Sequence, residues 1–369
     1  MLPNPQPYFA DLVDPRRETR NKLHALEDIV MITLCATLCG YNDWVSIEDF
    51  AHEHEDWLRE FLALSNGIPS HDTLSNVMGR IERKAFAEAF ARWMQDSLPE
   101  LGGRQIALDG KTLRGSRQPG GALHLMSAFA TEARLVLAQQ PVCGKANEIT
   151  ALPELMKLID LRGALVTIDA IGCQKGVAKQ LTQTKADYVL ALKRKHPLLL
   201  EEASLWIDEQ TQQGRVPVLE TLDKDHGRVE TRRYSLCTEL DWLSTRRDWA
   251  GLAAIGRVES CRQVGNQPAT TDVRYFLCSI TDLERFACSV RNHWAIENQQ
   301  HWVLDVQFNE DGSRARKDYS SSNLAAIRRA ALNLIRQNDS SKLSVGRRRM
   351  RACTNDAYRS QLLFGAENS

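Results

Sequence analysis

Two short apolar segments, each followed at once by an aspartate, constrain the fold of this chain most strongly. Residues 105–108 precede Asp109, and residues 164–168 precede Asp169. Both segments are typical of buried strands, and a carboxylate at the end of such a strand is costly to bury unless it is paired or binds a cation. Two strands that each deliver a carboxylate to their C-terminal end therefore predict a metal site.

Each aspartate also has a simpler interpretation when it is taken alone. Asp109 is followed by Gly110, and Asp-Gly is a strong turn dipeptide. Asp169 could be the N-cap of a helix that follows a strand. Because both carboxylates end apolar strands in one chain, the metal-site interpretation is favoured over the two simpler ones.

The order of elements between residues 101 and 200 predicts a ribonuclease H-like fold of the α/β class, as in retroviral integrases. Three strands come first, at 106–108, 124–130 and 134–141, and they should form an antiparallel meander. Alternating helices and strands follow, at 149–159, 165–168, 175–184 and 188–192. In such a sheet the first strand is central and the strand after the first helix lies beside it. Asp109 and Asp169 should then lie close together at one end of the sheet.

The regions on either side of this core have different patterns. Residues 1–100 read as a helical N-terminal domain. Two of its helices, up to residue 81 and over 84–97, are either a DNA-binding helix-turn-helix or a packing subdomain. Within a catalytic domain over 101–340, residues 200–284 read as a β-rich insertion, with a helix at 198–213 and then alternating strands. Residues 341–369 read as a basic tail.

The balance of charges, the cysteines and the lengths of the apolar runs limit the class of protein to which this chain can belong. Lys and Arg number 47 and so do Asp and Glu, so the formal net charge is zero and there is no global basic signal for nucleic acid. The nine cysteines show no CxxC pair and indicate reduced thiols in a cytosolic protein. We expect no signal peptide at the start and no membrane span. The apolar run 29–39 is about half of the ~20 residues that cross a bilayer, and it predicts a core helix.

A late helix, predicted over residues 286–306, carries a third candidate carboxylate. His293, Glu297 and His301 are spaced four residues apart, so they share roughly one helix face. A lone Glu on a helix is usually solvated. Here tryptophans at 294 and 302 flank it, which predicts a partly buried groove. The order of residues is not the HExxH pattern of zinc hydrolases, although a zinc hydrolase using the two histidines remains a weaker alternative.

Several basic side chains are candidates for contacts with DNA phosphates, because Lys and Arg make most such contacts. Surface ion pairs or solvated strand faces are the alternative. The candidates are Lys111, Arg114, Lys193, Arg194, Arg228, Arg232, Arg314 and Arg316.

Four motifs together resemble one family. They cover residues 107–116 (ALDGKTLRGS), 167–174 (TIDAIGCQ), 226–232 (HGRVETR) and 293–308 (HWAIENQQHWVLDVQF). The chain resembles the insertion-sequence DDE transposases that include the H-repeat-associated proteins. Residues 68–73 resemble the N-terminal associated domain of that family. The resemblance implies a catalytic triad of Asp109, Asp169 and Glu297, with a long insertion before the last acidic helix.

The same resemblance implies the chemistry and the partners. Three carboxylates suit two Mg²⁺ or Mn²⁺ ions, which stabilise the attacking and leaving oxygens of an in-line displacement. We expect phosphodiester hydrolysis at transposon ends, followed by attack of the 3′-OH on target DNA. The expected partners are double-stranded DNA, both terminal inverted repeats and target, and a second copy of the chain as a homodimer. We expect the bacterial cytosol as the location. An immobile or domesticated DDE-fold nuclease and a non-catalytic DNA-binding relic are the alternatives.

Overall fold

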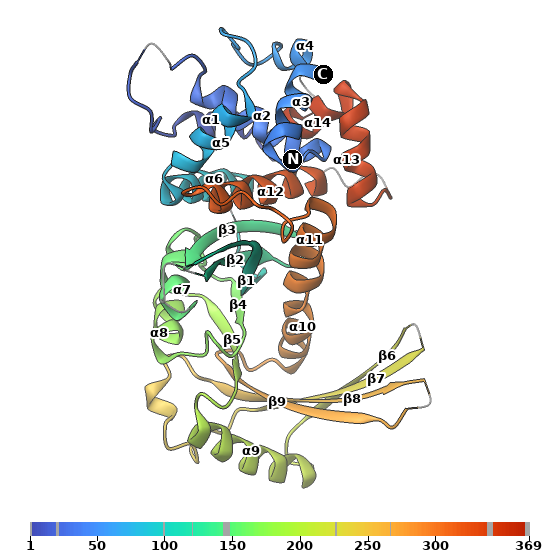
Figure 1. Cartoon of the computed structure of the whole chain (residues 1–369). Helices are drawn as coiled ribbons and strands as arrows, with labels where there is room; N and C mark the ends of the chain where they lie inside the picture. The colour runs from blue at the N-terminus through green and yellow to red at the C-terminus, as the bar shows by residue number, and fades with distance from the viewer. Residues whose placement is uncertain are drawn as a thin grey trace. The chain divides into compact units, whose positions relative to one another are not determined.

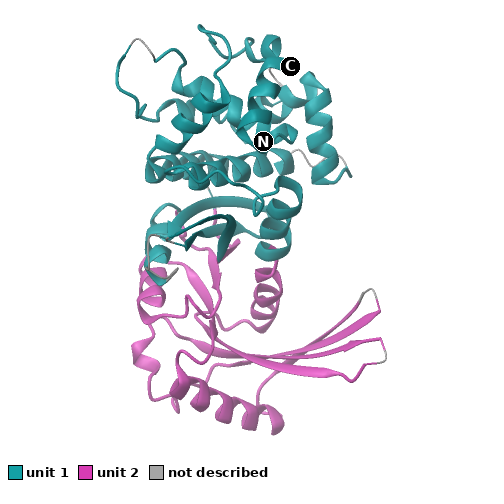
Figure 2. Ribbon diagram, viewed as in Figure 1, with its two compact units in different colours: residues 1–100, 110–159, 296–369 teal, residues 101–109, 160–295 magenta. Residues whose placement is uncertain are grey.

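The computed structural model divides into two compact units that are interleaved along the chain (Figure 2). Unit 1 comprises residues 1–100, 110–159 and 296–369, and unit 2 comprises residues 101–109 and 160–295. The structure describes the whole chain except residues 1, 20, 21, 99, 120, 143–147, 226, 266, 338–341 and 366–369. The two units are described separately below.

The N-terminal part of unit 1 is helical, as predicted (Figure 1). Helix α2 is buried at every residue except Glu27, which confirms the prediction of a core helix. Ser70 caps α5 by accepting a hydrogen bond from the Thr73 amide, again as predicted. The helices are α1 (Gln6–Ala10), α2 (Leu26–Cys39), α3 (Trp44–Glu53), α4 (Glu55–Leu58), α5 (His71–Arg80) and α6 (Arg83–Ser97).

Helix α6 has a packing role in unit 1. Phe86, Phe90 and Trp93 are buried on it, and the helix contacts α1, strand β3 (Leu135–Val142) and helix α12 (Ser320–Gln337). A recognition helix needs an exposed face for the major groove. Helix α6 packs on one face and exposes Lys84, Arg92 and Gln95, so the helix-turn-helix and the packing subdomain both stay predictions for the segment from α5 to α6.

The sheet of unit 1 has the hydrogen-bonded order β3-β2-β1, where β2 is Gly121–Ala130 and β1 is Gln105–Gln118. Strands β2 and β3 are antiparallel, as predicted. Helices α7 (Glu148–Lys157) and α12 pack on this sheet. Asn333 fixes α12 to β3, because its amide accepts from the Val136 amide at 2.9 Å and donates to the Val136 carbonyl at 2.8 Å.

Strand β1 is much longer than predicted. The sequence suggested that the chain leaves the strand at Asp109-Gly110, but the strand continues through both residues to Gln118. The turn interpretation of Asp109 is therefore wrong. The second half of β1 forms its own ladder with β2, so the Asp-Gly pair lies inside a continuous strand that takes part in both units.

The C-terminal region folds as helices α13 (Val345–Thr354) and α14 (Asp356–Phe364), so the prediction of a basic tail over 341–369 is wrong for its described part. Three of its arginines, Arg348, Arg349 and Arg359, are buried. Arg349 lies 3.9 Å from the Phe308 ring centroid and Arg359 lies 3.9 Å from that of Trp57. Their guanidinium groups also donate to backbone carbonyls, such as those of Thr37 and Ala352. Aromatic rings and backbone carbonyls therefore take the place of water around these guanidinium groups.

Unit 2 contains the parallel strands of the predicted core. Strand β1 pairs in parallel with β4 (Leu165–Ile168), and β4 pairs in parallel with β5 (Asp187–Leu192). Strand β9 (Thr270–Cys278) then joins β5 in the antiparallel direction. The order in this unit is β1-β4-β5-β9-β8-β7-β6. With β3-β2-β1 in unit 1, it gives the strand succession expected of a ribonuclease H-like core.

The predicted β-rich insertion is present. Strands β6 (Val218–Asp225), β7 (Arg228–Cys237), β8 (Ala254–Val264) and β9 form a continuous antiparallel ladder. Helix α10 (Leu283–His293) packs on it through Phe286, and an added Cβ at Gly256 would lie 2.2 Å from the Phe286 ring. The remaining helices of unit 2 are α8 (Lys175–Gln183), α9 (Pro197–Gln212) and the short 3₁₀ turn Arg246–Asp248.

Among the described residues, no single helix is both long and apolar enough to cross a membrane. Helices α2 and α3 meet the length and composition test only when they are taken together, and they are bent by 93° at the break between them.

Candidate catalytic site

The two aspartates follow the last paired residues of two neighbouring strands of unit 2. In the parallel ladder between β1 and β4, Leu108 pairs with Ile168. Asp109 and Asp169 are the next residues on these strands, and both are partly exposed. The register therefore places Asp109 and Asp169 at adjacent positions where the β1–β4 ladder ends, while β1 itself continues.

The backbone after β4 fixes the Asp169 side chain. The Ile171 amide donates to Asp169 Oδ1 at 3.0 Å, and the Gly172 amide donates to the Asp169 carbonyl at 3.1 Å. This is the Asx-type turn that a short carboxylate makes with its own backbone. Helix α8 begins only at Lys175, with Gln174 as its N-cap, so the alternative role of Asp169 as a helix cap is excluded.

A buried polar network lies below the aspartate pair, and no feature of the sequence indicated it. Gln105 Nε2 donates to Thr167 Oγ1 at 3.2 Å and to the Ser289 carbonyl at 2.8 Å. Thr167 Oγ1 also lies 2.8 Å from His293 Nδ1. The network therefore ties β1, β4 and α10 together. Burial lowers the pKa of His293 to about 4, so its imidazole is neutral at pH 7.

Glu297 lies on a π-helical turn, Ile296–His301, between α10 and α11 (Trp302–Phe308). The prediction of one helix over 286–306 is therefore wrong in its middle. Glu297 and its neighbour Asn298 are exposed, whereas Ile296 and Gln300 are buried. Single π-helical turns inside helices are often found at functional sites, because they aim a side chain away from the regular 3.6-residue path.

Glu297 belongs to unit 1, whereas the two aspartates belong to unit 2. Within the described part of the chain, no group of three or more His, Cys, Asp or Glu side chains is placed to hold a metal ion. The aspartate pair itself has the hard carboxylate oxygens that Mg²⁺ and Mn²⁺ prefer, so its donor chemistry fits these ions. The two histidines of the zinc alternative, His293 and His301, also belong to different units.

Lys111 is buried in unit 1, so its placement does not support a phosphate contact. Its side chain is only 8% exposed and forms an ion pair with Asp305 on α11. Its ammonium also lies 3.3 Å from Glu310 Oε2 and 3.5 Å from the His301 carbonyl. Residues 109 and 111 lie on the same face of β1, because side chains alternate along a strand. Lys111 thus connects the strand that continues from Asp109 to the helix that follows Glu297.

Glu310 completes this ion cluster. It is fully buried and accepts a 2.7 Å hydrogen bond from Arg329 on α12, which is also fully buried. Burial alone would raise the pKa of Glu310, but attraction to Arg329 and Lys111 outweighs burial and lowers it to about 2. Burial, with Arg329 and Lys111 nearby, lowers the pKa of His301 to about 3. We call Lys111, Asp305, Glu310 and Arg329 the ion cluster below.

Of the other basic candidates, some are paired with carboxylates and the rest are exposed. Arg232 pairs with Glu230 at 2.6 Å and also with Asp223, while Arg228 lies 3.6 Å from Glu230. Their charges are therefore balanced within unit 2. The exposed candidates are Arg114, Lys193, Arg194, Arg314 and Arg316. Of these, Arg114 Nε lies 3.5 Å from Asp311, and Arg316 donates to the Gly115 carbonyl at 2.8 Å.

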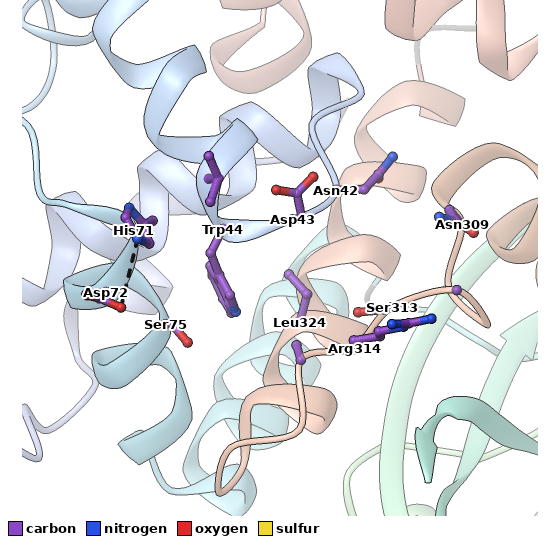
Figure 3. A pocket seen from close by; sticks show the side chains of 13 residues that line it. Asn42, Asp43, Trp44, His71, Asp72, Ser75, Asn309, Ser313, Arg314 and Leu324 are labelled. Carbon is purple, nitrogen blue, oxygen red and sulfur yellow. Dashed lines mark ion pairs between the residues drawn. The ribbon is translucent and has the colours of Figure 1, made fainter.

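Arg314 lines a pocket of about 460 Å³ in unit 1 (Figure 3). The N-terminal ends of α3 and α5 contribute Trp44 and His71, and the loop after α11 contributes Asn309 and Arg314. The hydrogen bond with Glu48 raises the pKa of His71 and favours its cationic form. The pocket lining thus combines the Trp44 indole and the Arg314 guanidinium with the carboxylates of Asp43 and Asp72.

Comparisons with known proteins identify two family patterns. Residues 100–334 match the family described as "Transposase DDE domain", and residues 7–94 match the family described as "DDE_Tnp_1-associated". A putative transposase, YncI, of Escherichia coli O157:H7 is 37% identical over 96% of this chain and 93% of its own length. The H repeat-associated putative transposase YhhI of Escherichia coli K12 is 35% identical over 96% of both chains.

A further relative, an uncharacterised protein from the dhlA 3′ region of Xanthobacter autotrophicus, is 47% identical over 76% of this chain and 96% of its own length. Among solved structures, a piggyBac transposase synaptic complex with hairpin DNA aligns with a TM-score of 0.46 and 14% identity. That alignment covers 99% of this chain and 80% of the other. The family patterns and the full-length relatives establish that this chain belongs to the DDE transposase family, with the H-repeat-associated transposases among its relatives.

Proposed function

We propose that the chain catalyses metal-dependent phosphodiester hydrolysis at transposon ends and then transfers the new 3′-OH into target DNA. The catalytic and metal-holding residues in this proposal are Asp109, Asp169 and Glu297. One observation carries it: in a chain of the DDE transposase family, Asp109 and Asp169 leave neighbouring parallel strands one residue beyond the paired Leu108 and Ile168.

The residues of the chain have distinct parts in this chemistry. Two Mg²⁺ or Mn²⁺ ions, when bound, would supply the Lewis acidity that stabilises the attacking and leaving oxygens of the phosphodiester. Asp109 and Asp169 would hold the ions with ionised oxygens, and the Ile171 amide fixes Asp169 for that task. Glu297 would add the third carboxylate from its exposed position on the π-helical turn. Neither neighbouring histidine competes as a cation, because burial keeps His293 and His301 neutral.

Double-stranded DNA is the proposed substrate, both as terminal inverted repeats and as target. The exposed side chains of Arg114, Lys193, Arg194, Arg314 and Arg316 are the proposed phosphate contacts. We further propose a homodimer that acts on paired ends in the bacterial cytosol, in line with the expectation from the family.

The test is cleavage of terminal-repeat DNA with Mg²⁺ by the parent and by the variants Asp109→Asn, Asp169→Asn and Glu297→Gln. We expect each variant to lose more than about a hundredfold in rate, because loss of only an outer-shell partner already costs 10–100-fold. Circular dichroism and urea unfolding check that each variant folds. Cleavage by a folded variant at the parental rate would refute the triad.

A strand-transfer assay with pre-cut ends separates the alternatives. A transposase joins the 3′-OH to target DNA, whereas a DDE-fold nuclease cuts but never joins. A non-catalytic relic binds DNA in a salt-sensitive manner and shows no metal-dependent cleavage at all.

A further inference from the structure

We propose that Lys111 is a positioning residue: with Asp305 and Glu310 it holds the helix that follows Glu297 against strand β1. This inference rests on the proposed function, because it assigns a task within the same catalytic site. The sequence had suggested a phosphate contact for Lys111, and its burial points to this different role.

The three side chains are anchored on or next to different elements of unit 1. Lys111 lies on β1, two residues after Asp109, and Asp305 lies on α11, two helical turns after Glu297. Glu310 follows α11 directly and is itself fixed by Arg329 on the buried helix α12. The ion cluster therefore connects three elements of unit 1, and one of them carries Glu297 on its N-terminal side.

The π-helical turn that carries Glu297 is itself held by side chains from β1 and α12. Such a turn interrupts the regular α-helix, so its position depends on what holds its two ends. At its C-terminal end, the Lys111 ammonium lies 3.5 Å from the His301 carbonyl, and His301 is the last residue of the turn. Arg336 on α12 donates to the Gln299 carbonyl within the turn. Lys111 thus contacts the turn itself as well as the helix beyond it.

The burial of the Lys111 side chain favours a positioning role over a contact with DNA. The Lys111 side chain is 8% exposed and the Glu310 side chain is fully buried. A buried ammonium that is paired with two carboxylates has its charge already neutralised, so it gains little from a phosphate on the surface. A residue in this environment affects catalysis by fixing geometry, and small shifts of a catalytic group have large effects on rate.

The experiment compares Lys111→Met with a matched control, Arg257→Met. Arg257 is also 8% exposed and also pairs with two carboxylates, those of Asp208 and Glu259, both at 2.7 Å. It lies on strand β8 of unit 2, in the antiparallel ladder of the β-rich insertion. Both variants remove a buried cation from between two acids, so both should lower the unfolding temperature. They differ only in their relation to Glu297.

The readouts are single-turnover cleavage at saturating terminal-repeat DNA, the Mg²⁺ concentration that gives half-maximal rate, and DNA affinity at several salt concentrations. For Lys111→Met we expect a rate loss of about 10–100-fold and a several-fold rise in the half-maximal Mg²⁺ concentration, the effects of losing an outer-shell partner. Mn²⁺ should recover part of the rate. DNA affinity and its salt dependence should stay at the parental values. Arg257→Met should keep the parental metal dependence.

A second variant keeps the inference testable if Lys111→Met does not fold. Asp305 is 33% exposed, so Asp305→Asn removes one charge at similar size and with a smaller loss of stability. It should raise the half-maximal Mg²⁺ concentration in the same direction.

Two results would overturn the inference. The first is a folded Lys111→Met protein with parental rate and metal dependence. The second is a variant that has lost DNA affinity and salt dependence but has the parental rate at saturating DNA, which would identify a phosphate contact. Asp109→Asn, measured alongside, distinguishes these results from failure of the proposed function: if that variant also cleaves, the catalytic assignment itself is wrong and the inference falls with it.

Discussion

Two histidines, each four residues from Glu297 in the sequence, are kept neutral by burial. His293 has a pKa of about 4 and His301 a pKa of about 3 in the folded chain, against 6.5 in an unfolded one. Between pH 6.5 and these lower values the unfolded chain binds protons that the folded chain does not. The free energy of unfolding must therefore fall as the pH falls through this range.

This difference gives a test of stability against pH. Between pH 6.5 and pH 5, each histidine should lower the free energy of unfolding by up to about 1.4 kcal/mol per pH unit. Above pH 6.5 the two should have no effect. The variant His301→Gln should therefore show a weaker dependence in urea titrations at pH 7.5, 6 and 5. Changing His52, which is exposed, to Gln should leave the dependence unchanged. Equal dependence in the parent and His301→Gln would contradict the assignment.

At the scale of residues, the sequence was informative where a charge interrupts an apolar strand. Asp109 and Asp169 could be placed together because strand order and register follow from the pattern of elements. Lys111 could not be placed in the same way. Its partners, Asp305 and Glu310, are distant in sequence, and only the folded chain brings them to one buried point. A basic residue that follows an aspartate at the end of an apolar segment looks the same in sequence whether it meets phosphate or carboxylate.

At the scale of elements, the loop after α11 lies very close to β1. An added Cβ at Gly115 would lie 2.2 Å from the Ser313 carbonyl oxygen and 2.6 Å from that of Asp311. Both are backbone atoms, so no side chain can rotate to make room. The glycine thus permits the loop that carries Arg314 and Arg316 to dock on the strand.

Replacing Gly115 by Ala should therefore destabilise the protein by about 1–3 kcal/mol, the usual cost of overpacking a closed site. The measurement is the free energy of unfolding in urea. Gly176→Ala is the control: Gly176 lies in helix α8, and an added Cβ there would meet nothing within 4 Å. The control should be neutral or slightly stabilising, since Ala is the better helix former. A neutral Gly115→Ala would show that the loop can move away at no cost.

Most elements could be predicted from periodicity, but the π-helical turn, the full length of β1 and the two C-terminal helices could not. The π-helical turn at Ile296–His301 has the same spacing of apolar residues as a continuous helix, so the pattern predicted one. The many arginines of the C-terminal helices favour, by composition, a solvated tail. In the structure Arg348, Arg349 and Arg359 are buried against aromatic rings and backbone carbonyls, which composition alone cannot show.

At the scale of the whole molecule, equal numbers of acidic and basic residues mean that DNA binding depends on which cations lack a partner. Arg314 is exposed, and it forms no ion pair or hydrogen bond within the described ranges. Arg246 is also partly exposed, but it pairs with Asp241 at 2.7 Å. The two arginines should therefore contribute differently to binding, although each carries one charge.

The expected outcome is a change in the salt dependence of DNA affinity. Arg314→Ala should weaken binding and reduce the slope of log K against log[salt] by about one, the value for one lost phosphate contact. Arg246→Ala should leave both unchanged. Filter binding or fluorescence anisotropy between 50 and 200 mM salt measures the slope, at about the range in which such contacts are best resolved. An unchanged slope in Arg314→Ala would remove that residue from the DNA interface.

The interleaving of the two units has a consequence for how the protein is made. All of unit 2 has been synthesised by Ala295, but the sheet of unit 1 still lacks α12, whose side chains from Leu324 to Ile335 are all buried. Domains usually fold as they emerge from the ribosome, N-terminal parts first. Here the apolar face formed by α2, α6 and β3 must wait for residues near the end of the chain. A product shortened by a frameshift or a nonsense codon would leave that face open to proteases, so only ribosomes that read through α12 release a durable enzyme.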